Sequence, residues 1–294
     1  MIHVANGRDG YKKILNTVID EGRPITARDQ LTHDLGYTLI VLDEPEEALP
    51  IGIGRNLDPR IAAVEAIQLI GGFYDHELVE RQAPRLLKYA DRHGYMIDHM
   101  TNEKTDIMRL HGAYGARIGN QLPQVIEKIK RDRETRQAVI TLWDPWLDNL
   151  PEKHDYPCTV MMQFRVYQSK LEMNVIMRSN DAWLGLPYDM FQFTQLHLTV
   201  ARILELAPGP YHHTALSLHI YERDVDTARQ LIESTPLLSG RMYQPSGIGR
   251  MGDTVSQVRE RCRALATNGT LAGMTVSEGW YGEYLTAQLT PHMG

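Results

Sequence analysis

Apolar and polar positions recur at recognisable spacings along the first half of the chain. Residues 11–21 predict a helix because apolar side chains recur three and four positions apart. Residues 37–42 form a mostly apolar stretch typical of a strand, and residues 59–71 predict a helix that begins with proline and ends with glycine. Two further helices are predicted at 85–92 and 122–133. This half of the chain therefore mixes helices with a strand.

The second half of the chain contains a pair of alternating segments. Residues 158–166 and 170–177 alternate apolar and polar side chains, and a turn around Gln168 and Ser169 joins them, so the pattern predicts a β-hairpin. The remaining predicted elements are a glycine-bearing turn at 112–119, a strand at 138–143, a long buried helix at 190–206, a strand at 216–221 and a helix at 225–233. Together these elements favour an α/β or α+β fold.

The chain of 294 residues is long enough to bury a large core without disulfides or metals. No internal repeat or low-complexity linker divides it, so we expect a single domain over residues 1–294. From about Ser239 onward the sequence is rich in glycine, serine and threonine and has little periodicity. We expect residues 239–294 to be an irregular C-terminal extension, to which no motif assigns a role.

Composition and charge exclude several classes of protein. Hydrophobic residues make up 43% and charged residues 23% of the chain, which excludes disordered, collagen-like and coiled-coil proteins. The net charge of −6 argues against sequence-independent binding to DNA, RNA or anionic lipid. Cys158 and Cys262 are the only cysteines, the start of the chain lacks a signal-peptide core, and no apolar run approaches the roughly 18 to 20 residues of a membrane span. We expect a soluble, cytoplasmic protein.

Common catalytic motifs are missing from the sequence. Residues 52–57 lack the last glycine of a dinucleotide-binding fingerprint, and the sequence has no P-loop, no GxSxG and no HExxH. The neighbouring histidines, His93 with His99 and His212 with His213, have no cysteine or carboxylate at ligand spacing. We therefore predict no metal site, and the common nucleotide-binding and hydrolase classes are disfavoured.

The most informative segment covers residues 156–198. It contains a Pro-Cys-Thr triplet centred on Cys158 and then the run RSNDAWLGLPYD at 178–189. In this run an Arg-Ser pair ends a strand, and two aspartates flank a Leu-Gly-Leu-Pro turn. Such residues suit a site for an anion and a polar ring better than they suit a core. Taken alone, Cys158 would more often be a small buried apolar side chain in a strand.

These motifs resemble those of the thymidylate synthase family, and most closely its branch of deoxycytidylate (dCMP) and cytidylate (CMP) 5-hydroxymethylases. The resemblance covers about residues 11–235, and its most specific part is RSxDxxLGxP at a fixed distance after Pro-Cys. It implies a large mixed β-sheet flanked by helices, a homodimer formed through that sheet, and 5,10-methylenetetrahydrofolate as co-substrate. It also implies that Cys158 is the nucleophile that adds to C6 of the pyrimidine. That reaction needs a thiolate, which cationic neighbours favour.

The resemblance also implies which residues bind the nucleotide phosphate and sugar. The implied phosphate ligands are Arg28, Arg136, Arg178 and Ser179. The family takes the counterpart of Arg136 from the partner subunit, which implies composite active sites in the homodimer. His219 and Tyr221 match the His-x-Tyr pair that binds the sugar 3′-hydroxyl.

Four further positions are implied to lie around the base and the folate. Glu65 matches the helix-borne glutamate that organises water and proton transfers, although a glutamate on the polar face of a helix is the plainer alternative. Tyr114 matches a tyrosine of the active-site cavity. Asp181 and Gly185 match positions that meet the folate pterin.

Differences from the methylating synthases predict the base and the product. Asp189 stands where the family has asparagine, and a carboxylate accepts a hydrogen bond from the cytosine 4-amino group, so we predict cytosine. Thr159 and Met177 replace a usual histidine and glutamine. No tryptophan precedes Tyr114, whereas the methylating enzymes carry one that shields the exocyclic methylene from water. Gln137 replaces a usual second arginine, which weakens the implied phosphate site.

We therefore predict a dimeric enzyme that transfers a one-carbon unit from 5,10-methylenetetrahydrofolate to C5 of dCMP and adds water, giving 5-hydroxymethyl-dCMP. Three alternatives stay open: a CMP 5-hydroxymethylase of nucleoside-antibiotic biosynthesis, a methylating dUMP or dCMP synthase, and a catalytically silent homologue that binds a nucleotide or RNA as a regulator. Arg136 and Ser179 keep the residue types of deoxynucleotide enzymes, which favours dCMP over CMP. The retained Cys158 and Glu65 and the negative net charge argue against the regulator.

Overall fold

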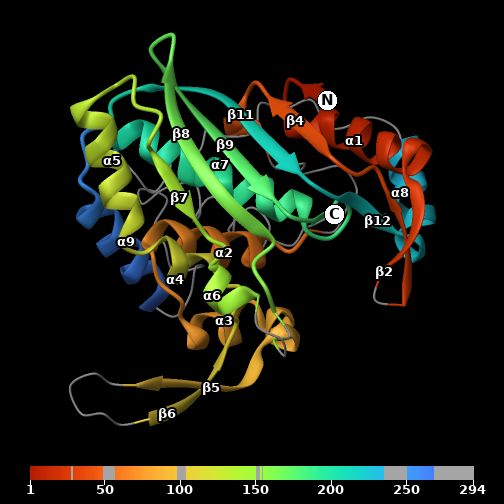
Figure 1. Ribbon diagram of the computed structural model, residues 1–294, viewed down its shortest axis with the longest axis horizontal. Helices are drawn as coiled ribbons and strands as arrows, with labels where there is room; N and C mark the ends of the chain where they lie inside the picture. Colours follow the sequence, from red (N-terminus) through yellow and green to blue (C-terminus); the bar gives the residue numbers. More distant parts are fainter. Residues whose placement is uncertain are drawn as a thin grey trace, which may run out of the picture.

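The computed structural model describes residues 1–27, 29–48, 57–97, 104–149, 153, 155–234 and 250–267. The largest feature of the protein is a six-stranded sheet with the strand order β1-β4-β11-β9-β8-β7 (Figure 1). Its strands are β1 (Ile2–Val4), β4 (Thr38–Leu42), β11 (Ala207–Ala215), β9 (Lys170–Met177), β8 (Thr159–Tyr167) and β7 (Val139–Thr141). The sheet is mixed, because β1 pairs with β4 and β9 pairs with β11 in parallel, whereas the other neighbours are antiparallel.

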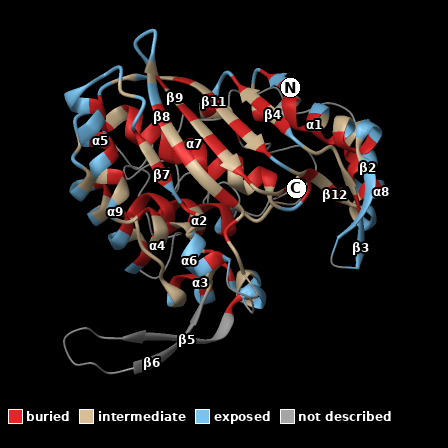
Figure 2. Ribbon diagram, in the orientation of Figure 1, coloured by how far each residue is buried: buried red, intermediate tan, exposed pale blue. Residues whose placement is uncertain are grey.

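Helix α7 (Leu186–Ile203) lies across one face of this sheet and packs against β9, β11 and helix α2 (Pro59–Gly71) (Figure 1). Figure 2 shows that buried residues concentrate in α7, α2 and the inward faces of the strands. α7 is buried on nearly all sides, including polar residues such as Gln192 and His197. The predicted large mixed sheet flanked by helices is therefore confirmed, and the helix predicted at 190–206 begins earlier, at Leu186.

Helix α2 has well-defined ends. Asp58 caps its start by accepting a hydrogen bond from the backbone N–H of Arg60 at 3.0 Å, and Pro59 occupies the first turn. The helix ends at Gly72, whose φ of 68° lies in the left-handed region that glycine adopts without strain. The prediction of a helix at 59–71 is confirmed.

A smaller four-stranded sheet lies at one end of the large one, with the order β10-β12-β3-β2 (Figure 1). Its strands are β10 (Asn180–Asp181), β12 (Leu218–Tyr221), β3 (Gln30–Asp34) and β2 (Arg23–Ala27). Helices α1 (Gly7–Glu21) and α8 (Glu222–Glu233) pack against each other and against β12 and β3. The helices predicted at 11–21 and 225–233 and the strand predicted at 216–221 are confirmed with slightly shifted ends.

The predicted hairpin is confirmed as β8 and β9, which pair antiparallel up to Tyr167 and Lys170. The two residues between them, Gln168 and Ser169, have φ of 47° and 61°. Two consecutive positive φ values are characteristic of the type I′ turn, whose twist matches that of the flanking strands. The hairpin holds Cys158, directly before β8, in a fixed register with the end of β9.

Several segments differ from the predictions, and the turn predicted at 112–119 contains helix α4 (Tyr114–Ile118). The helix predicted at 85–92 is right only in part: residues Pro84–Tyr89 form the short 3-10 helix η2, and β5 (Asp91–Ile97) then pairs with β6 (Lys104–Arg109). Strand pairing overrides the helical spacing there. β11 escapes prediction because prolines interrupt it, and the structure accommodates them with a register shift between Pro208 and Tyr211.

The C-terminal expectation is wrong in part. Residues Val255–Thr267 form helix α9, which packs against α2 through the buried Val258, Cys262 and Ala266. Short side chains at helical spacing carry this contact, and they give a weak apolar signal in the sequence. The rest of the expected extension, 239–249 and 268–294, lies outside the described residues, and the single domain stays a prediction. The remaining elements are η1 (Pro45–Glu47), α3 (His76–Gln82), α4 (Tyr114–Ile118), α5 (Gln121–Arg131) and α6 (Pro145–Asp148).

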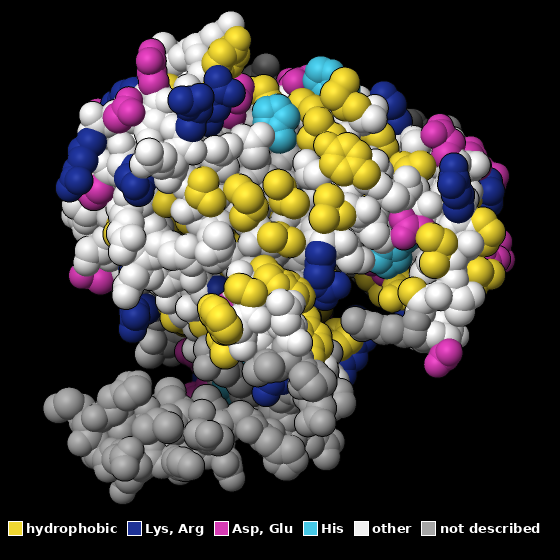
Figure 3. Space-filling view, viewed as in Figure 1, with side chains coloured by type: hydrophobic (Ala, Val, Ile, Leu, Met, Phe, Trp, Pro, Cys, Tyr) yellow, Lys and Arg dark blue, Asp and Glu magenta, His cyan; other side chains and the backbone are white. Residues whose placement is uncertain are grey.

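The face of the six-stranded sheet that points away from α7 is open among the described residues (Figure 1). Figure 3 shows hydrophobic side chains gathered over this face. Met161 and Ile176 are cross-strand neighbours at the end near Cys158, and Arg165 faces Glu172 at the hairpin end. None of the described helices is long and apolar enough to cross a lipid bilayer.

Candidate active site

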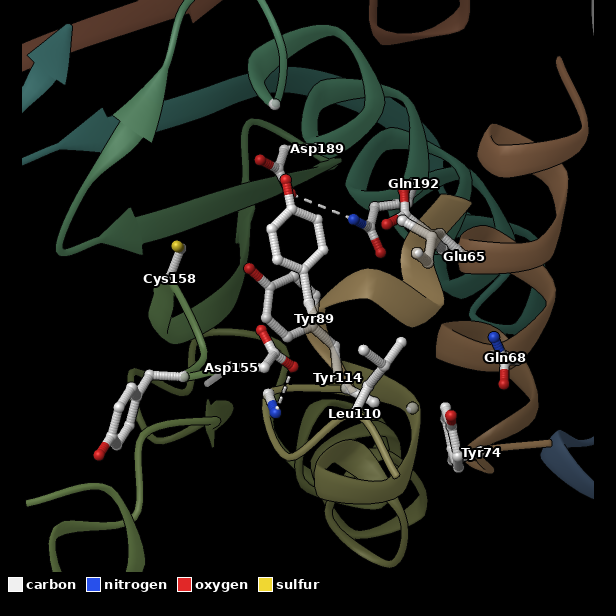
Figure 4. A pocket seen from close by; sticks show the side chains of 16 residues that line it. Glu65, Gln68, Tyr74, Tyr89, Leu110, Tyr114, Asp155, Cys158, Asp189 and Gln192 are labelled. Carbon is white, nitrogen blue, oxygen red and sulfur yellow. Dashed lines mark hydrogen bonds between the residues drawn. The ribbon is translucent and has the colours of Figure 1, made fainter. Parts of the chain in front are cut away.

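A cavity of about 290 Å³ opens where the start of β8 meets α2, α4 and the first turns of α7. Five of the predicted site residues line it together: Glu65, Tyr114, Cys158, Gly185 and Asp189 (Figure 4). They come from four separate stretches of the chain, and the fold brings them into one site. This convergence supports the sequence-based assignment of a reaction centre around Cys158.

Arg178 holds the segment that carries the cysteine. Its Nε donates a hydrogen bond to the carbonyl oxygen of Pro157 at 3.0 Å, and its Nη2 lies 3.7 Å from the Sγ of Cys158. The guanidinium also lies over the ring of Trp143, 5.7 Å from the ring centre. A cation beside the sulfur favours the thiolate over the thiol. Cys262 is different, because burial raises the pKa of its thiol to about 12.

Asp189 projects into the cavity from the first turn of α7. Asn180 donates a hydrogen bond from Nδ2 to Oδ2 of Asp189 at 2.7 Å, and Gln192 donates from Nε2 to Oδ1 at 3.1 Å. Burial raises the pKa of Asp189 to about 7 against the opposing effect of these two donors. The carboxyl group is therefore fixed in orientation, and near neutral pH both its neutral and its ionised forms are populated.

Glu65 projects into the same cavity from α2. Burial, followed by the negative charges of Asp189 and Asp155, raises the pKa of Glu65 to about 8. Its Oε2 is buried and has no hydrogen-bond partner among the described residues. A neutral carboxyl group with an unpaired buried oxygen is ready to bind a ligand or a water molecule, so the plainer alternative of a polar-face glutamate does not fit this geometry.

Tyr114 begins α4 and stacks on Phe193 of α7, with ring centres 5.7 Å apart. The close approach of α4 to α2 depends on Gly115, where a Cβ atom would lie 2.1 Å from the carbonyl oxygen of Phe73. Burial raises the pKa of Tyr114 well above its usual value, so the phenol stays protonated. Tyr114 is thus a fixed hydroxyl group on the cavity wall.

A second group of predicted residues lies on β10 and β12, outside this cavity. Asp181 and His219 are neighbours in the parallel pairing of the two strands, and the rings of His219 and Tyr221 lie 5.5 Å apart, edge to face. Asp181 accepts the backbone N–H groups of Trp183 and Leu184 at 2.8 and 3.0 Å. Desolvation by burial raises the pKa of Asp181 despite these bonds. Asn180, the residue before Asp181, connects this group to the cavity through Asp189.

Of the implied phosphate ligands that the structure describes, Arg178 and Ser179 lie next to Cys158 and Arg136 does not line the cavity. Arg178 lies beside Cys158, and Ser179 follows it, half-buried. Arg136 is exposed in the turn before β7 and does not line the cavity. Its backbone carbonyl accepts a hydrogen bond from the side chain of Gln163. Arg28 lies outside the described residues.

Several cavity residues escaped the sequence analysis. These are Gln68, Tyr74, Tyr89, Asp155 and Gln192. Gln192 is one helical turn after Asp189, so its spacing was a usable signal. Tyr74 and Tyr89 belong to segments with no motif of their own. None of the described residues that line the cavity is a tryptophan. The described residues also contain no group of three histidine, cysteine or acidic side chains that could hold a metal ion.

Comparison with known proteins places the chain in a family. Residues 9–244 match the family described as Thymidylate synthase, so the chain belongs to the thymidylate synthase family. Enzymes of this family use methylenetetrahydrofolate as co-substrate.

Among its relatives, the chain is 29% identical to the deoxyuridylate hydroxymethyltransferase of Bacillus phage SP01, over 73% of this chain and 57% of that protein. It is also 29% identical to the deoxyuridylate hydroxymethyltransferase of Pseudomonas phage M6, over 70% of this chain and 57% of that protein. The bifunctional dihydrofolate reductase-thymidylate synthase of Zea mays is 30% identical over 49% of this chain and 27% of that protein. The chain thus spans little more than half the length of the two phage relatives.

Proposed function

We propose that this protein transfers a one-carbon unit from 5,10-methylenetetrahydrofolate to C5 of a pyrimidine deoxynucleotide and adds water, and that dCMP is the nucleotide. The observation that carries this proposal is the position of Asp189. Its carboxyl group, oriented by Asn180 and Gln192, lines the same cavity as the Cys158 thiol. A pyrimidine attacked by Cys158 at C6 would present its other edge to Asp189.

The chemistry begins with Cys158. The thiolate, favoured by the Arg178 guanidinium, adds to C6 of the pyrimidine and makes C5 nucleophilic. C5 then takes the one-carbon unit, which the folate supplies at the oxidation level of formaldehyde. Glu65, neutral at pH 7, donates a proton or a hydrogen bond near the base. Release of C5–H and addition of water complete the hydroxymethyl group, and loss of Cys158 from C6 restores the aromatic ring.

The folate pterin is a flat, partly apolar ring, and the cavity fits such a group. Beyond Cys158 and Gly185 it continues along the side chains of Leu86, Tyr89 and Leu110. Gly185 would allow the pterin to approach the backbone, and Asp181 lies four residues earlier at the start of the same turn. The unpaired Oε2 of Glu65 is the buried polar atom that a ligand in this cavity would satisfy.

The preference for cytosine follows from hydrogen-bond donors and acceptors. The cytosine 4-amino group donates to a carboxylate oxygen, and the neutral form of Asp189 can also donate to N3. Because the pKa of Asp189 is about 7, both forms are available near neutral pH. An asparagine at this position has no ionised form, so it cannot present two accepting oxygens to the 4-amino group.

Deoxyuridylate is the second candidate, and the two phage relatives favour it because they are named as deoxyuridylate hydroxymethyltransferases. The structure offers a physical route to it. A neutral carboxyl group has one donor and one acceptor, as an amide does, so neutral Asp189 can pair with O4 and N3–H of uracil. Ionised Asp189 has no donor and would repel O4.

We further propose a homodimer in which the open face of the six-stranded sheet packs against a second copy. Arg136 is exposed and away from the Cys158 cavity, so a partner subunit is needed if this residue is to reach the phosphate. The apolar side chains of Met161 and Ile176 on that face suit such contact. Association of two copies through the same face is the common two-fold arrangement.

The product distinguishes hydroxymethyl from methyl transfer. Hydride transfer would oxidise tetrahydrofolate to dihydrofolate, whereas water addition regenerates tetrahydrofolate. No tryptophan is present among the described cavity residues, and hydroxyl and carboxyl groups from Tyr89, Tyr114 and Asp155 line the wall, which supports access of water.

The test is a mass spectrum of the nucleotide product after separate incubations with dCMP, dUMP and CMP. We expect dCMP to gain one CH₂O unit without stoichiometric dihydrofolate. Conversion of dUMP in preference to dCMP would select the second candidate, and faster conversion of CMP would select the ribonucleotide enzyme. A gain of only CH₂ with matching dihydrofolate would make the protein a methylating synthase. If no nucleotide is converted and tritium is not released from C5, the protein is a silent binder.

A further inference from the structure

The cavity contains a third carboxylate that neither the sequence motifs nor the reaction described above accounts for. Asp155 lies three residues before Cys158 and lines the same cavity (Figure 4). Its negative charge is one of the causes that raise the pKa of Glu65, after burial and the charge of Asp189, so Asp155 and Glu65 act on each other across the cavity.

A hydrogen bond to the backbone fixes the orientation of the Asp155 side chain. Oδ2 of Asp155 accepts a hydrogen bond from the backbone N–H of Gly112 at 2.7 Å, drawn as a dashed line in Figure 4. Gly112 belongs to the loop that leads into α4 and Tyr114. A Cβ atom at Gly112 would lie 2.8 Å from that same Oδ2 and 2.8 Å from the backbone carbonyl carbon of Tyr156. Only glycine therefore allows the two segments to meet so that the Gly112 N–H orients the carboxylate.

The other two carboxyl groups of the cavity are engaged in other ways. Asp189 uses Oδ2 to accept from Asn180 and Oδ1 to accept from Gln192, at the position where the base would bind. Glu65 has a pKa of about 8 and is neutral at pH 7, so it is a proton donor rather than a base under these conditions. Addition of water to a carbon centre needs a group that takes the proton of the water.

We infer that Asp155 is the general base that activates the water of the hydroxymethylation step. This inference rests on the proposed function. In that step the pyrimidine is bonded to Cys158 through C6 and carries an exocyclic methylene at C5. The oxygen of the water bonds to the methylene carbon, and the proton of the water passes to the Asp155 carboxylate. The electron pair of the C5–methylene double bond moves into the ring, and expulsion of the Cys158 thiolate then restores the C5–C6 double bond. Asp155 afterwards releases its proton to solvent.

The variant Asp155→Asn tests this role, because asparagine keeps an oxygen that can accept from Gly112 N–H but cannot take a proton. Three quantities are measured with tritium-labelled dCMP and 5,10-methylenetetrahydrofolate: tritium released from C5, hydroxymethyl nucleotide formed, and the mass of the enzyme. The wild-type protein is expected to release one tritium per product. In Asp155→Asn we expect hydroxymethyl product to fall at least about 100-fold, as is typical for loss of a general base.

The step at which the variant stops is the decisive readout. Tritium release occurs before water addition, so Asp155→Asn should still release about one tritium per active site in the first turnover. The enzyme should then gain the mass of the nucleotide plus one methylene carbon, held on Cys158. The variant Asp226→Asn, an exposed aspartate on α8, is the matched control and should behave as wild type. The dissociation constant for dCMP should be unchanged in both variants.

A second variant, Gly112→Ala, keeps the carboxylate but displaces it, because the new Cβ atom collides with Asp155. It should show the same uncoupling of tritium release from product, to a smaller degree. Product formation by Asp155→Asn within about threefold of wild type would overturn the inference, as would an equal loss of tritium release and product. If the wild-type protein itself releases no tritium or forms no hydroxymethyl nucleotide, the proposed function fails, and this result is recognised without any variant.

Discussion

The two ends of the proposed nucleotide site are built in different ways. At the base end, Cys158, Glu65 and Asp189 are held by buried elements of one chain, with each carboxyl group constrained by burial or by hydrogen bonds. At the proposed phosphate end, Arg178 lies beside Cys158, but Arg136 is exposed and does not line the cavity. Among the described residues, one chain therefore brings together the proposed reacting groups but does not bring Arg136 to the cavity.

This contrast indicates that the bond-forming groups need fixed positions, whereas the phosphate-binding groups can come from a second subunit. Bond-forming groups benefit from fixed positions, because small displacements cost large factors in rate. A phosphate is a large, doubly charged target that mobile arginines can bind from a neighbouring subunit. Changes at the base end should therefore alter chemistry within a subunit, and changes at Arg136 should act across subunits.

The largest effect is expected from Cys158→Ala. Loss of the sulfur removes the covalent step, so turnover should fall by more than about 1,000-fold, whereas dCMP binding should change little because the phosphate ligands are intact. Steady-state rates and equilibrium binding measure the two quantities. The buried Cys262→Ala should leave turnover almost unchanged. A Cys158→Ala protein that kept a tenth of the wild-type rate would rule out covalent catalysis.

Subunit mixing tests the phosphate end. Cys158→Ala and Arg136→Ala proteins should each be nearly inactive, but a mixed dimer has one site with both residues intact. After unfolding and refolding in equal amounts, half the dimers are mixed, so activity should return to about one quarter of wild type. Each variant refolded alone is the control. No recovery, with mixed dimers present, would mean that Arg136 serves its own subunit.

Glu65→Gln tests the cost of burying the carboxyl group at the base end. The pKa of Glu65 is about 8 in the folded protein and 4.5 ordinarily, so its contribution to stability is full below about 4.5 and is lost as the pH rises through about 8. Between pH of about 5 and about 9, the free energy of unfolding should fall more for wild type than for Glu65→Gln, by on the order of a few kcal/mol. Urea unfolding at each pH measures this. Parallel curves for the two proteins would contradict a buried neutral Glu65.

A smaller effect is expected at the edge of the base. Asp189→Asn should weaken dCMP turnover and improve dUMP relative to it, because a mispaired buried polar group costs about 1 to 3 kcal/mol, or roughly 5- to 150-fold in preference. Competition between the two nucleotides in one reaction measures the ratio directly. An unchanged ratio would show that Asp189 does not read the base.

Local patterns predicted the central elements of the fold but not its smaller strands and helices. The helix at 59–71, the hairpin of β8 and β9 and the buried α7 each have strong periodicity, and all three were confirmed. β11 was missed because prolines interrupt it and its partners β4 and β9 lie far along the chain, and β5 was missed because helical spacing hides its pairing with the neighbouring β6. Local propensity describes a segment alone, whereas strand pairing also depends on a partner segment elsewhere in the chain.

The site was predictable to the extent that motifs marked it. Cys158, Asp189 and Gly185 lie in one run of sequence, and Glu65 was found by its pattern. Asp155 was not predicted, because no motif marks it. Its side chain is oriented by the backbone N–H of Gly112, more than forty residues earlier in the chain. The raised pKa of Asp189 likewise depends on burial by several elements, which no local motif records.

The ends of the large sheet bear on how copies of this protein meet. Its two outermost strands, β1 and β7, are three residues long each, so they expose few unpaired backbone N–H and C=O groups. Short outer strands are a common safeguard against growth of a sheet by addition of strands from other molecules, which is a route to aggregates. In the proposed homodimer, these short outer strands beside the open face would favour contact through that face over addition of strands at the edges. Contact of this kind would join two copies without extending the sheet.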